Sequence, residues 1–228
     1  MIIDMHCHFD MIPNPESFLR KHEMAGDIVI GMTNIPSHFE IGVSHVKKYN
    51  TVRLSLGFHP QLAEENQSEL HKFTSLLSKT SYVGEIGLDF NKYFINSKSI
   101  QLATFDYICS CLSGHKKIIS IHSRMAERAV IEILSKYNIS IPIFHWYTGP
   151  LNLIPQIIEL GGYFSINEAM TLSEKGRKII SKIPLDRLLT ESDAPYNSFS
   201  NIKNAIKALS LSEEMIYENF KKLISGIK

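Results

Sequence analysis

Short apolar runs alternate with amphipathic stretches along the chain, and this order limits the possible folds most strongly. Eight runs have the pattern of buried strands, and most of the stretches between them have the period of helices. Eight alternating units favour an α/β fold, the closed (β/α)₈ TIM-type barrel, with parallel strands inside and helices outside. The expected strands cover residues 1–6, 27–32, 52–57, 82–85, 118–122, 141–145, 162–166 and 187–190, and the expected helices cover residues 15–24, 66–78, 97–112, 126–137, 151–160, 174–183 and 202–225.

Length and composition favour a single domain over residues 1–228. A chain of 228 residues with 44% hydrophobic residues can bury one sizeable core. Its 24 basic and 23 acidic residues leave a formal charge of +1, which excludes a global basic field for nonspecific nucleic-acid binding. No basic leader or membrane-length apolar run is present, and the three cysteines form no obvious disulfide framework. We therefore expect a soluble, cytoplasmic protein without a membrane partner.

Chemically active side chains end or follow most of the expected strands. His6 and His8 lie two residues apart on the first strand, so they point to the same face and can reach one metal ion. In a barrel of this kind, the carboxyl-terminal ends of the strands meet at one rim, where active sites lie. The further candidates at this rim are His59, Glu85, His122, His145 and Asp193.

The joint pattern of these seven residues favours a metal site. Histidines and carboxylates are the usual ligands of catalytic zinc and manganese, and a carboxylate can bridge two ions. Any one strand-end histidine, taken alone, is more often a satisfied core or surface residue. Five histidines and two acids at such positions are an improbable accident, because barrel packing does not favour buried polar groups there. The other five histidines lie in expected helices or loops, and we interpret them as surface residues.

The ordered motifs resemble those of the TatD family, metal-dependent deoxyribonucleases of the amidohydrolase-like superfamily of metal-dependent hydrolases. The resemblance runs from Ile3 to about Tyr196. Within it, residues 145–150, 161–167 and 188–196 are most similar to the QatD group, the TatD-like components of the Qat anti-phage defence system. The motifs are Asp-Met-His-Cys-His, Gly-Phe-His-Pro, Gly-Glu-Ile-Gly-Leu-Asp, Ile-His-Ser-Arg, His-Trp-Tyr-Thr-Gly and Glu-Ser-Asp-Ala-Pro.

The resemblance implies a centre with two divalent metal ions that act on a DNA phosphodiester. The ions would share a water molecule and lower its pKa, and Asp193 would also accept its proton. His59 would bind the scissile phosphate, separate from the metal ligands. The implied ligands are His6, His8 and Asp193 for one ion and His122 and His145 for the second, with Glu85 as the bridge.

Other residues near the rim have both a functional and a structural interpretation. Arg124 could bind a phosphate or form a local salt bridge. Trp146 and Tyr147 could stack on unpaired bases, although loop packing is the more frequent role of such residues. Asp4 and Glu191 could orient imidazoles, but packing and solvent pairing explain them equally well. We therefore leave Asp4 and Glu191 outside the expected site.

The sequence leaves alternatives open for the metal, the substrate and the function. Nitrogen-rich ligation favours zinc or manganese, while a carboxylate-bridged site can also take magnesium when substrate phosphate helps. A barrel mouth suits the end of a single DNA strand better than a duplex. One alternative is a small-molecule amidohydrolase or esterase, which Glu85 disfavours because many such enzymes would have a lysine at the bridging position. Another is a weakly active binding subunit of a defence complex, which the complete ligand set disfavours.

The chain departs from the family pattern after about residue 196. There we expect a shortened C-terminal region with one long helical stretch, residues 202–225. The loop at residues 91–96 also looks shorter than the usual one. A trimmed rim would open the pocket or leave a surface for a partner. The expected partners are therefore the DNA substrate and other proteins of the Qat defence system.

Overall fold

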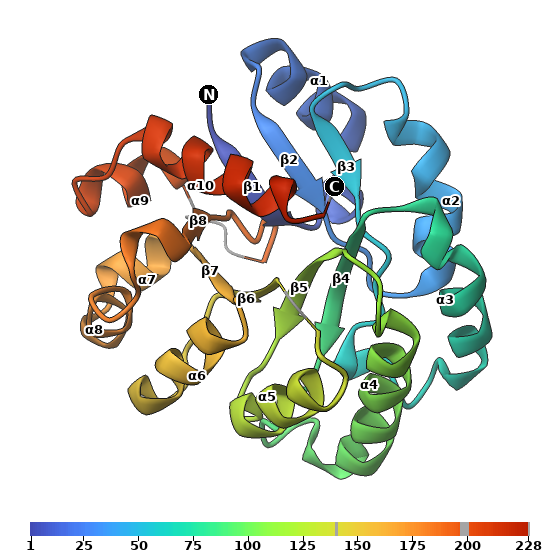
Figure 1. The fold of residues 1–228 in the computed structure, drawn as a ribbon. Helices are drawn as coiled ribbons and strands as arrows, with labels where there is room; N and C mark the ends of the chain where they lie inside the picture. Colours follow the sequence, from blue (N-terminus) through green and yellow to red (C-terminus); the bar gives the residue numbers. More distant parts are fainter. Residues whose placement is uncertain (140, 197–200, 228) are drawn as a thin grey trace.

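Eight parallel strands form a ring inside a layer of helices (Figure 1). The computed structural model describes residues 1–139, 141–196 and 201–227. The arrangement confirms the expected (β/α)₈ barrel. The strands are β1 (Ile3–Cys7), β2 (Ile28–Gly31), β3 (Val52–Leu54), β4 (Tyr82–Gly87), β5 (Ile118–His122), β6 (Pro142–His145), β7 (Tyr163–Ile166) and β8 (Leu188–Thr190).

The ring consists of two hydrogen-bonded ladders, β1 to β3 and β4 to β8. At the joint between β3 and β4, Leu56 donates its N–H to the carbonyl of Tyr82 at 3.0 Å, and Gly84 donates to the carbonyl of Leu56 at 2.9 Å. At the other joint, Asp193 donates its N–H to the carbonyl of His6 at 2.9 Å. This second joint brings the residues that follow β8 directly beside the end of β1.

Helices surround the strands and bury apolar side chains against them. Phe39, Phe73 and Phe105 point inward from three neighbouring helices and are each at most 1% exposed. None of the helices in the described residues is long and apolar enough to cross a membrane. The helices are α1 (Pro15–Ala25), α2 (Pro36–Val46), α3 (Leu70–Leu76), α4 (Lys98–Leu112), α5 (Glu127–Lys136), α6 (Ile154–Glu159), α7 (Glu168–Leu172), α8 (Glu174–Ile180), α9 (Ile202–Ala208) and α10 (Glu213–Ser225).

The helices differ from the sequence-based expectation at α2 and α7, neither of which was predicted, and over residues 202–225. We did not predict α2, where Gly42 and two β-branched neighbours weaken helix propensity, so burial of Phe39 and Val46 stabilises the helix instead. The single helix expected over residues 202–225 is wrong, because α9 and α10 are separate. Ser210 has a left-handed φ of 54°, and the side chain of Ser212 accepts a hydrogen bond from the N–H of Met215, which starts α10.

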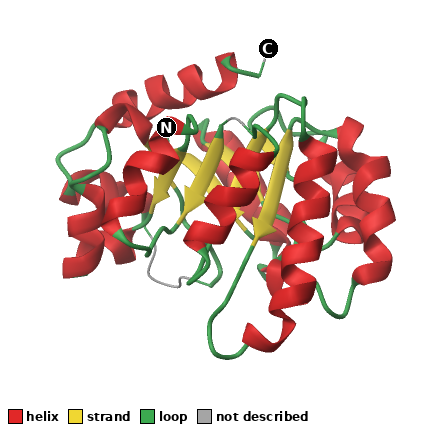
Figure 2. Ribbon diagram, turned by 60° about the horizontal axis from the view of Figure 1, so that its bottom comes forward, coloured by secondary structure: helices red, strands yellow, loops and turns green. Residues whose placement is uncertain are grey.

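Helix α10 lies across the amino-terminal end of the barrel, opposite the strand ends that carry the candidate site. The Asn219 side chain donates hydrogen bonds to the carbonyls of Leu185 at 2.7 Å and Leu188 at 2.8 Å, where β8 begins. Gly226, which follows α10, packs closely against Ile141, just before β6: a Cβ on Gly226 would lie 2.8 Å from the Ile141 side chain. Figure 2 shows this last helix at the end away from the arrowheads of the strands. The opposite end of the barrel is therefore the one available to a ligand.

Candidate metal centre

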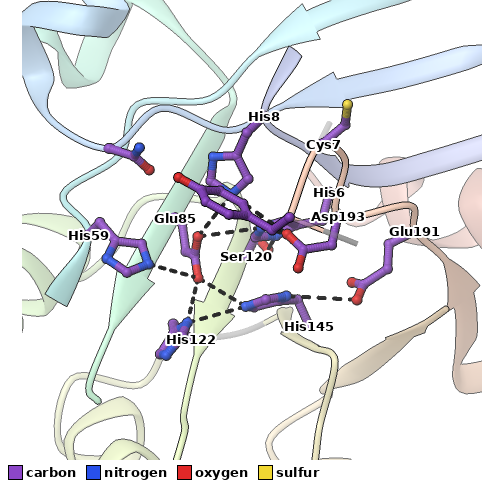
Figure 3. Close-up of polar contacts among 12 residues, drawn as sticks. His6, Cys7, His8, His59, Glu85, Ser120, His122, His145, Glu191 and Asp193 are labelled. Atoms are coloured by element: carbon purple, nitrogen blue, oxygen red, sulfur yellow. Dashed lines mark hydrogen bonds and ion pairs between the residues drawn. The ribbon is translucent and has the colours of Figure 1, made fainter. Parts of the chain in front are cut away.

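Glu85 lies at the centre of a buried polar cluster at the carboxyl-terminal ends of the strands (Figure 3). The register of β4 against β5 shifts between Val83 and Ile86, so the strand is irregular where Glu85 lies. Gly84 has a φ of 150°, and a Cβ there would lie 2.8 Å from the Cβ of Ser120. Glycine is therefore required beside the carboxylate. The irregular strand directs Glu85 into the barrel, where the residue is 2% exposed.

The two carboxylate oxygens of Glu85 face two different groups of histidines. Oε1 lies near three imidazoles, and Oε2 lies near two others. This division is the geometry that a carboxylate between two cations requires. From Oε1, the distances are 2.6 Å to His122 Nδ1, 2.9 Å to His145 Nε2 and 3.4 Å to His59 Nε2, and from Oε2 they are 3.2 Å to His8 Nε2 and 3.4 Å to His6 Nε2.

On the Oε2 side, His6, His8 and Asp193 surround one point. The two Nε2 atoms of His6 and His8 are 3.2 Å apart, and Asp193 Oδ1 lies 3.7 Å and 3.8 Å from them. Two imidazole lone pairs at this separation repel each other unless a proton or a cation lies between them. The Nδ1 atom of His8 is buried without a hydrogen-bond partner among the described residues. Two nitrogens and a carboxylate oxygen, all within 4.8 Å of one another, fit a divalent cation.

On the Oε1 side, His122 and His145 offer nitrogen atoms to a second point. His145 Nε2 lies 3.4 Å from His122 Nδ1, and both lie within 3 Å of Glu85. The His145 ring also stacks on His6, with the ring centroids 3.9 Å apart. This stacking places the two groups side by side in the barrel mouth. The expected ligands from β1, β4, β5, β6 and the segment after β8 are therefore brought together in one cluster.

Outer polar residues orient the imidazoles of this cluster. Ser120 Oγ lies 2.8 Å from His6 Nδ1, and Asp89 Oδ2 lies 3.0 Å from His122 Nε2. Glu191 Oε1 lies 3.7 Å from His145 Nδ1. An imidazole that donates one N–H outward keeps a lone pair on its other nitrogen, which can bind a metal. In His6 and His122, that other nitrogen is the one that faces Glu85. His145 Nδ1 lies too far from Glu191 for a hydrogen bond, and its Nε2 faces Glu85.

His59 differs from the other histidines in its hydrogen bonding. It follows β3, and the backbone N–H of Gln61 donates to its Nδ1 at 3.2 Å. Because Nδ1 accepts this bond, a neutral His59 carries its proton on Nε2. That Nε2–H faces the pocket, 3.4 Å from Glu85 Oε1. By distance His59 belongs to the cluster, but this hydrogen bond makes it a donor rather than a metal ligand.

Burial and neighbouring charges set the protonation of the cluster. Burial alone would raise the pKa of Glu85, but the surrounding histidines hold it well below its usual range. Burial lowers the pKa of His6 well below its usual value. Burial also opposes the charged form of His145, yet Glu85 and Glu191 raise its pKa well above the usual value. These directions favour an ionised Glu85 and a neutral His6, and they favour positive charge beside His145, which a bound cation would supply in place of a proton.

A cavity of about 750 Å³ opens above the cluster. Arg124, Trp146 and Thr148 line it together with His38, an exposed histidine that we interpreted as a surface residue. Tyr147 does not belong to this lining, because it is 1% exposed and donates its hydroxyl to the carbonyl of Pro150 at 2.7 Å. Tyr147 therefore has the packing role, whereas Arg124 and Trp146 are placed to contact a ligand.

The outer residues are the part of the site that sequence reasoning missed. Asp89 lies in the same motif as Glu85, four residues later, and Ser120 lies two residues before His122 on the same face of β5. Both spacings are visible in the sequence and mark Asp89 and Ser120 as candidates for the site. Glu191 was considered as an orienting residue and left out of the expected site. In the structure it lies near His145 and also forms hydrogen bonds with the side chains of Ser165 and Asn167. Glu191, Ser165 and Asn167 are all buried.

Comparison with known proteins connects this geometry to one group of hydrolases. Residues 3–224 match the sequence model of the family described as TatD related DNase. A metal-dependent hydrolase of Buchnera aphidicola is 33% identical over 218 residues, which cover 86% of this chain and 82% of the relative. The deoxyribonuclease Tat-D of Schizosaccharomyces pombe is 29% identical over 116 residues, 50% of this chain and 37% of the relative. The crystal structure of YjjV, a TatD homologue from Escherichia coli, superposes with a TM-score of 0.84 at 23% identity, covering 99% of this chain and 97% of that one.

Proposed function

Because the chain belongs to the TatD-related DNase family of metal-dependent hydrolases, we propose that it hydrolyses phosphodiester bonds of DNA with two divalent metal ions. One observation carries this proposal. The two oxygens of Glu85 face separate histidine groups on its two sides. A carboxylate in that position can bind both ions of a two-metal site, an arrangement that phosphatases and nucleases use.

Each proposed ion has its own set of ligands from the described residues. The donor set is rich in nitrogen, which favours zinc or manganese, and magnesium is the third candidate. When bound, the ions would generate a nucleophilic water at neutral pH and offset the negative charge of the reacting phosphate. His6, His8 and Asp193 would hold one ion, His122 and His145 the other, and Glu85 would lie between them.

The chain's own residues supply the remaining chemistry. Hydrolysis forms one P–O bond from water and breaks the P–O bond to the leaving nucleotide, so one proton must leave the attacking water. In the metal-free protein, burial and the nearby carboxylates of Glu191 and Glu85 raise the pKa of Asp193 to about 7. Asp193 would accept the proton of the attacking water. The Nε2–H of His59 would donate to a non-bridging phosphate oxygen, and Arg124 would bind a phosphate at the pocket wall.

The pocket supports the end of a single strand as the substrate. Its volume of about 750 Å³ lies within the roughly 300–1,000 Å³ of pockets that hold one small molecule. A terminal nucleotide fits such a space, and a barrel mouth suits a single strand better than a duplex. Trp146 lines the pocket and offers an aromatic face to an unpaired base.

Cleavage of end-labelled oligonucleotides tests the proposal. Single-stranded and duplex DNA are incubated with the protein and Mn²⁺, Zn²⁺ or Mg²⁺, with and without a chelator, beside Glu85→Gln. Glu64→Gln is the matched control, because Glu64 is exposed and outside the pocket. We expect wild type and Glu64→Gln to shorten the single strand from its end only with metal. Cleavage that survives both chelation and Glu85→Gln contradicts the proposal, and ester hydrolysis without DNA cleavage would favour a small-molecule hydrolase.

We further propose that this activity serves anti-phage defence together with other proteins of the Qat system. The similarity of residues 145–150, 161–167 and 188–196 to the QatD group supports this role. The test is co-purification of the tagged chain with the proteins encoded beside its gene, followed by measurement of its mass in solution. A stable complex is the expected result. A chain that purifies alone as a monomer contradicts the proposed partnership.

A further inference from the structure

A second hollow lies beside the catalytic pocket on the same rim of the barrel. Its volume is about 530 Å³, and its lining comes from the segments after β5 and β6 and from α8. Thr148 lines both this hollow and the catalytic pocket, so the two spaces share a wall. A chain that leaves the pocket over Thr148 therefore enters the second hollow.

The mouth of this outer hollow is basic. Lys175 and Lys178 lie on α8 with both residues exposed. Lys178 pairs with Glu174 at 2.7 Å on the same helix, whereas Lys175 has no carboxylate within ion-pair distance in the described ranges. Arg124 is exposed in the wall of the adjacent pocket, so three cations line the two adjoining spaces. The one acidic residue of the lining, Glu127, is only 8% exposed, so the solvent-facing charge of the hollow is positive.

Apolar side chains complete the lining. Met125 is 67% exposed and Leu151 is 39% exposed, so both offer apolar surface to the hollow. The φ of Met125 is 57°, in the left-handed region, which strains a residue that is not glycine. This strained turn holds Met125 at the edge of the hollow, three residues after the proposed ligand His122. A flexible thioether chain in this position can pack against the flat face of a base.

We propose that the outer hollow binds the second nucleotide of a single DNA strand while its terminal nucleotide occupies the catalytic pocket. Lys175 and Lys178 hold the phosphate of that nucleotide, and Met125 packs against its base. The alternation of positive charge and apolar surface matches the alternation of phosphates and bases along an unpaired strand. The inference rests on the proposed nuclease function and adds to it the path of the substrate.

The test compares a long and a short phosphodiester substrate on the metal-loaded enzyme. Bis(4-nitrophenyl) phosphate reaches only the catalytic pocket, whereas pentathymidylate extends into the outer hollow. The variant is Lys175→Gln with Lys178→Gln. The control, Lys116→Gln with Lys221→Gln, removes the same charge far from the hollow: Lys116 precedes β5, and Lys221 lies on α10 in an ion pair with Glu218. Circular dichroism establishes that both variants are folded.

In the Lys175→Gln, Lys178→Gln variant, the kcat/KM for pentathymidylate relative to that for the small diester should fall about tenfold. The slope of log kcat/KM for pentathymidylate against log salt should become less steep by about 0.7, the contribution of the one single-strand phosphate that the two lysines hold. Met125→Gln should raise the KM for pentathymidylate without changing that slope. The control variant should change neither quantity.

The failures of the two proposals are distinguishable. If wild type cleaves both substrates and the lysine variant keeps the wild-type ratio and salt slope, the outer hollow does not bind the strand. Equal effects of the lysine variant and the control overturn the inference as well, because net charge would then explain the result. If wild type cleaves neither substrate with any of the three metals, the proposed function fails together with the inference.

Discussion

The two ends of this barrel are built from the same eight strands, but they differ in how their polar groups are satisfied. At the carboxyl-terminal end, five imidazoles gather around the buried carboxylate of Glu85, and the Nδ1 atoms of His8 and His145 lack hydrogen-bond partners among the described residues. At the amino-terminal end, α10 covers the strands, and Asn219 donates hydrogen bonds to two backbone carbonyls. Buried polar groups oppose folding unless they are paired. One end therefore stabilises the fold, and the other is arranged for chemistry.

The largest effect should come from the centre of the carboxyl-terminal cluster. Glu85→Gln keeps the size of the side chain but removes the charge between the two histidine groups. We expect DNA cleavage to fall by about 10³-fold or more, because the proposed ions would stabilise the reacting phosphate by several kcal/mol and each ~1.4 kcal/mol is a factor of ten. Initial rates on an end-labelled single strand measure this loss. Wild-type rates in this variant would show that Glu85 has no role in the cleavage reaction.

A smaller effect, on metal affinity, is expected at Asp89, which contacts a proposed ligand rather than the metal. Asp89 is buried, its carboxylate lies 3.0 Å from His122 Nε2, and Gln61 donates to it at 2.7 Å. Asp89→Asn removes the charge that holds the His122 ring, so divalent metal should bind about 10–100-fold more weakly. Isothermal titration of the metal-free protein measures this change. The matched control is Asp106→Asn, whose carboxylate pairs with Lys136 outside the site at 2.7 Å. Equal affinity in both variants would show that Asp89 has no orienting role.

At the amino-terminal end, a substitution should change stability and leave the metal centre intact. Asn219→Ala removes the donor for the carbonyls of Leu185 and Leu188. The free energy of unfolding should fall by about 1–3 kcal/mol, because these carbonyls lose their side-chain partner in a buried place. Urea denaturation measures the change, and metal content after dialysis is the second readout. A large loss of metal in this variant would mean that the two ends are not separable.

The smallest effect concerns acid stability, also at the amino-terminal end. The hydroxyl of Thr51, with the amides of Asn50 and Thr51, lowers the pKa of Glu23 from 4.5 to about 2. Because the pKa of Glu23 is lower in the folded than in the unfolded protein, the ionised carboxylate stabilises the fold above about pH 4.5. This stabilisation is lost as the pH falls toward 2. Glu23→Gln should flatten this part of the stability curve by under about 1 kcal/mol, because the carboxylate is largely solvated. An unchanged pH dependence would contradict the assignment.

The sequence allowed prediction of most of the barrel and of the inner part of the site, for one physical reason. Side chains at the carboxyl-terminal ends of parallel strands must converge, so His6, His122 and His145 could be grouped without knowing any distance. The alternating pattern also placed all eight strands within a few residues of their observed bounds. Local periodicity and strand order were sufficient for these features.

Features that depend on contacts between distant segments could not be predicted in this way. The role of Asp89 follows from its distance to His122, 33 residues away, and that of Ser120 from its distance to His6, 114 residues away. The hydrogen bond that makes His59 a donor depends on the backbone conformation after β3. Helix α2 forms through burial rather than through local propensity. The spacings of Asp89 and Ser120 mark both residues as candidates in the sequence, but the partners of their side chains, like the other two features, depend on contacts that only coordinates show.

Metal content tests the two-ion centre most directly. The account predicts two divalent ions per chain in the wild-type protein after loading and dialysis, measured by plasma mass spectrometry. In His8→Ala it predicts one ion, because Glu85, His122 and His145 still surround the second point. His45→Ala is the control, an exposed histidine outside the cluster, and it should retain two ions. Equal metal content in wild type and His8→Ala, or fewer than two ions in the wild type, would contradict the account.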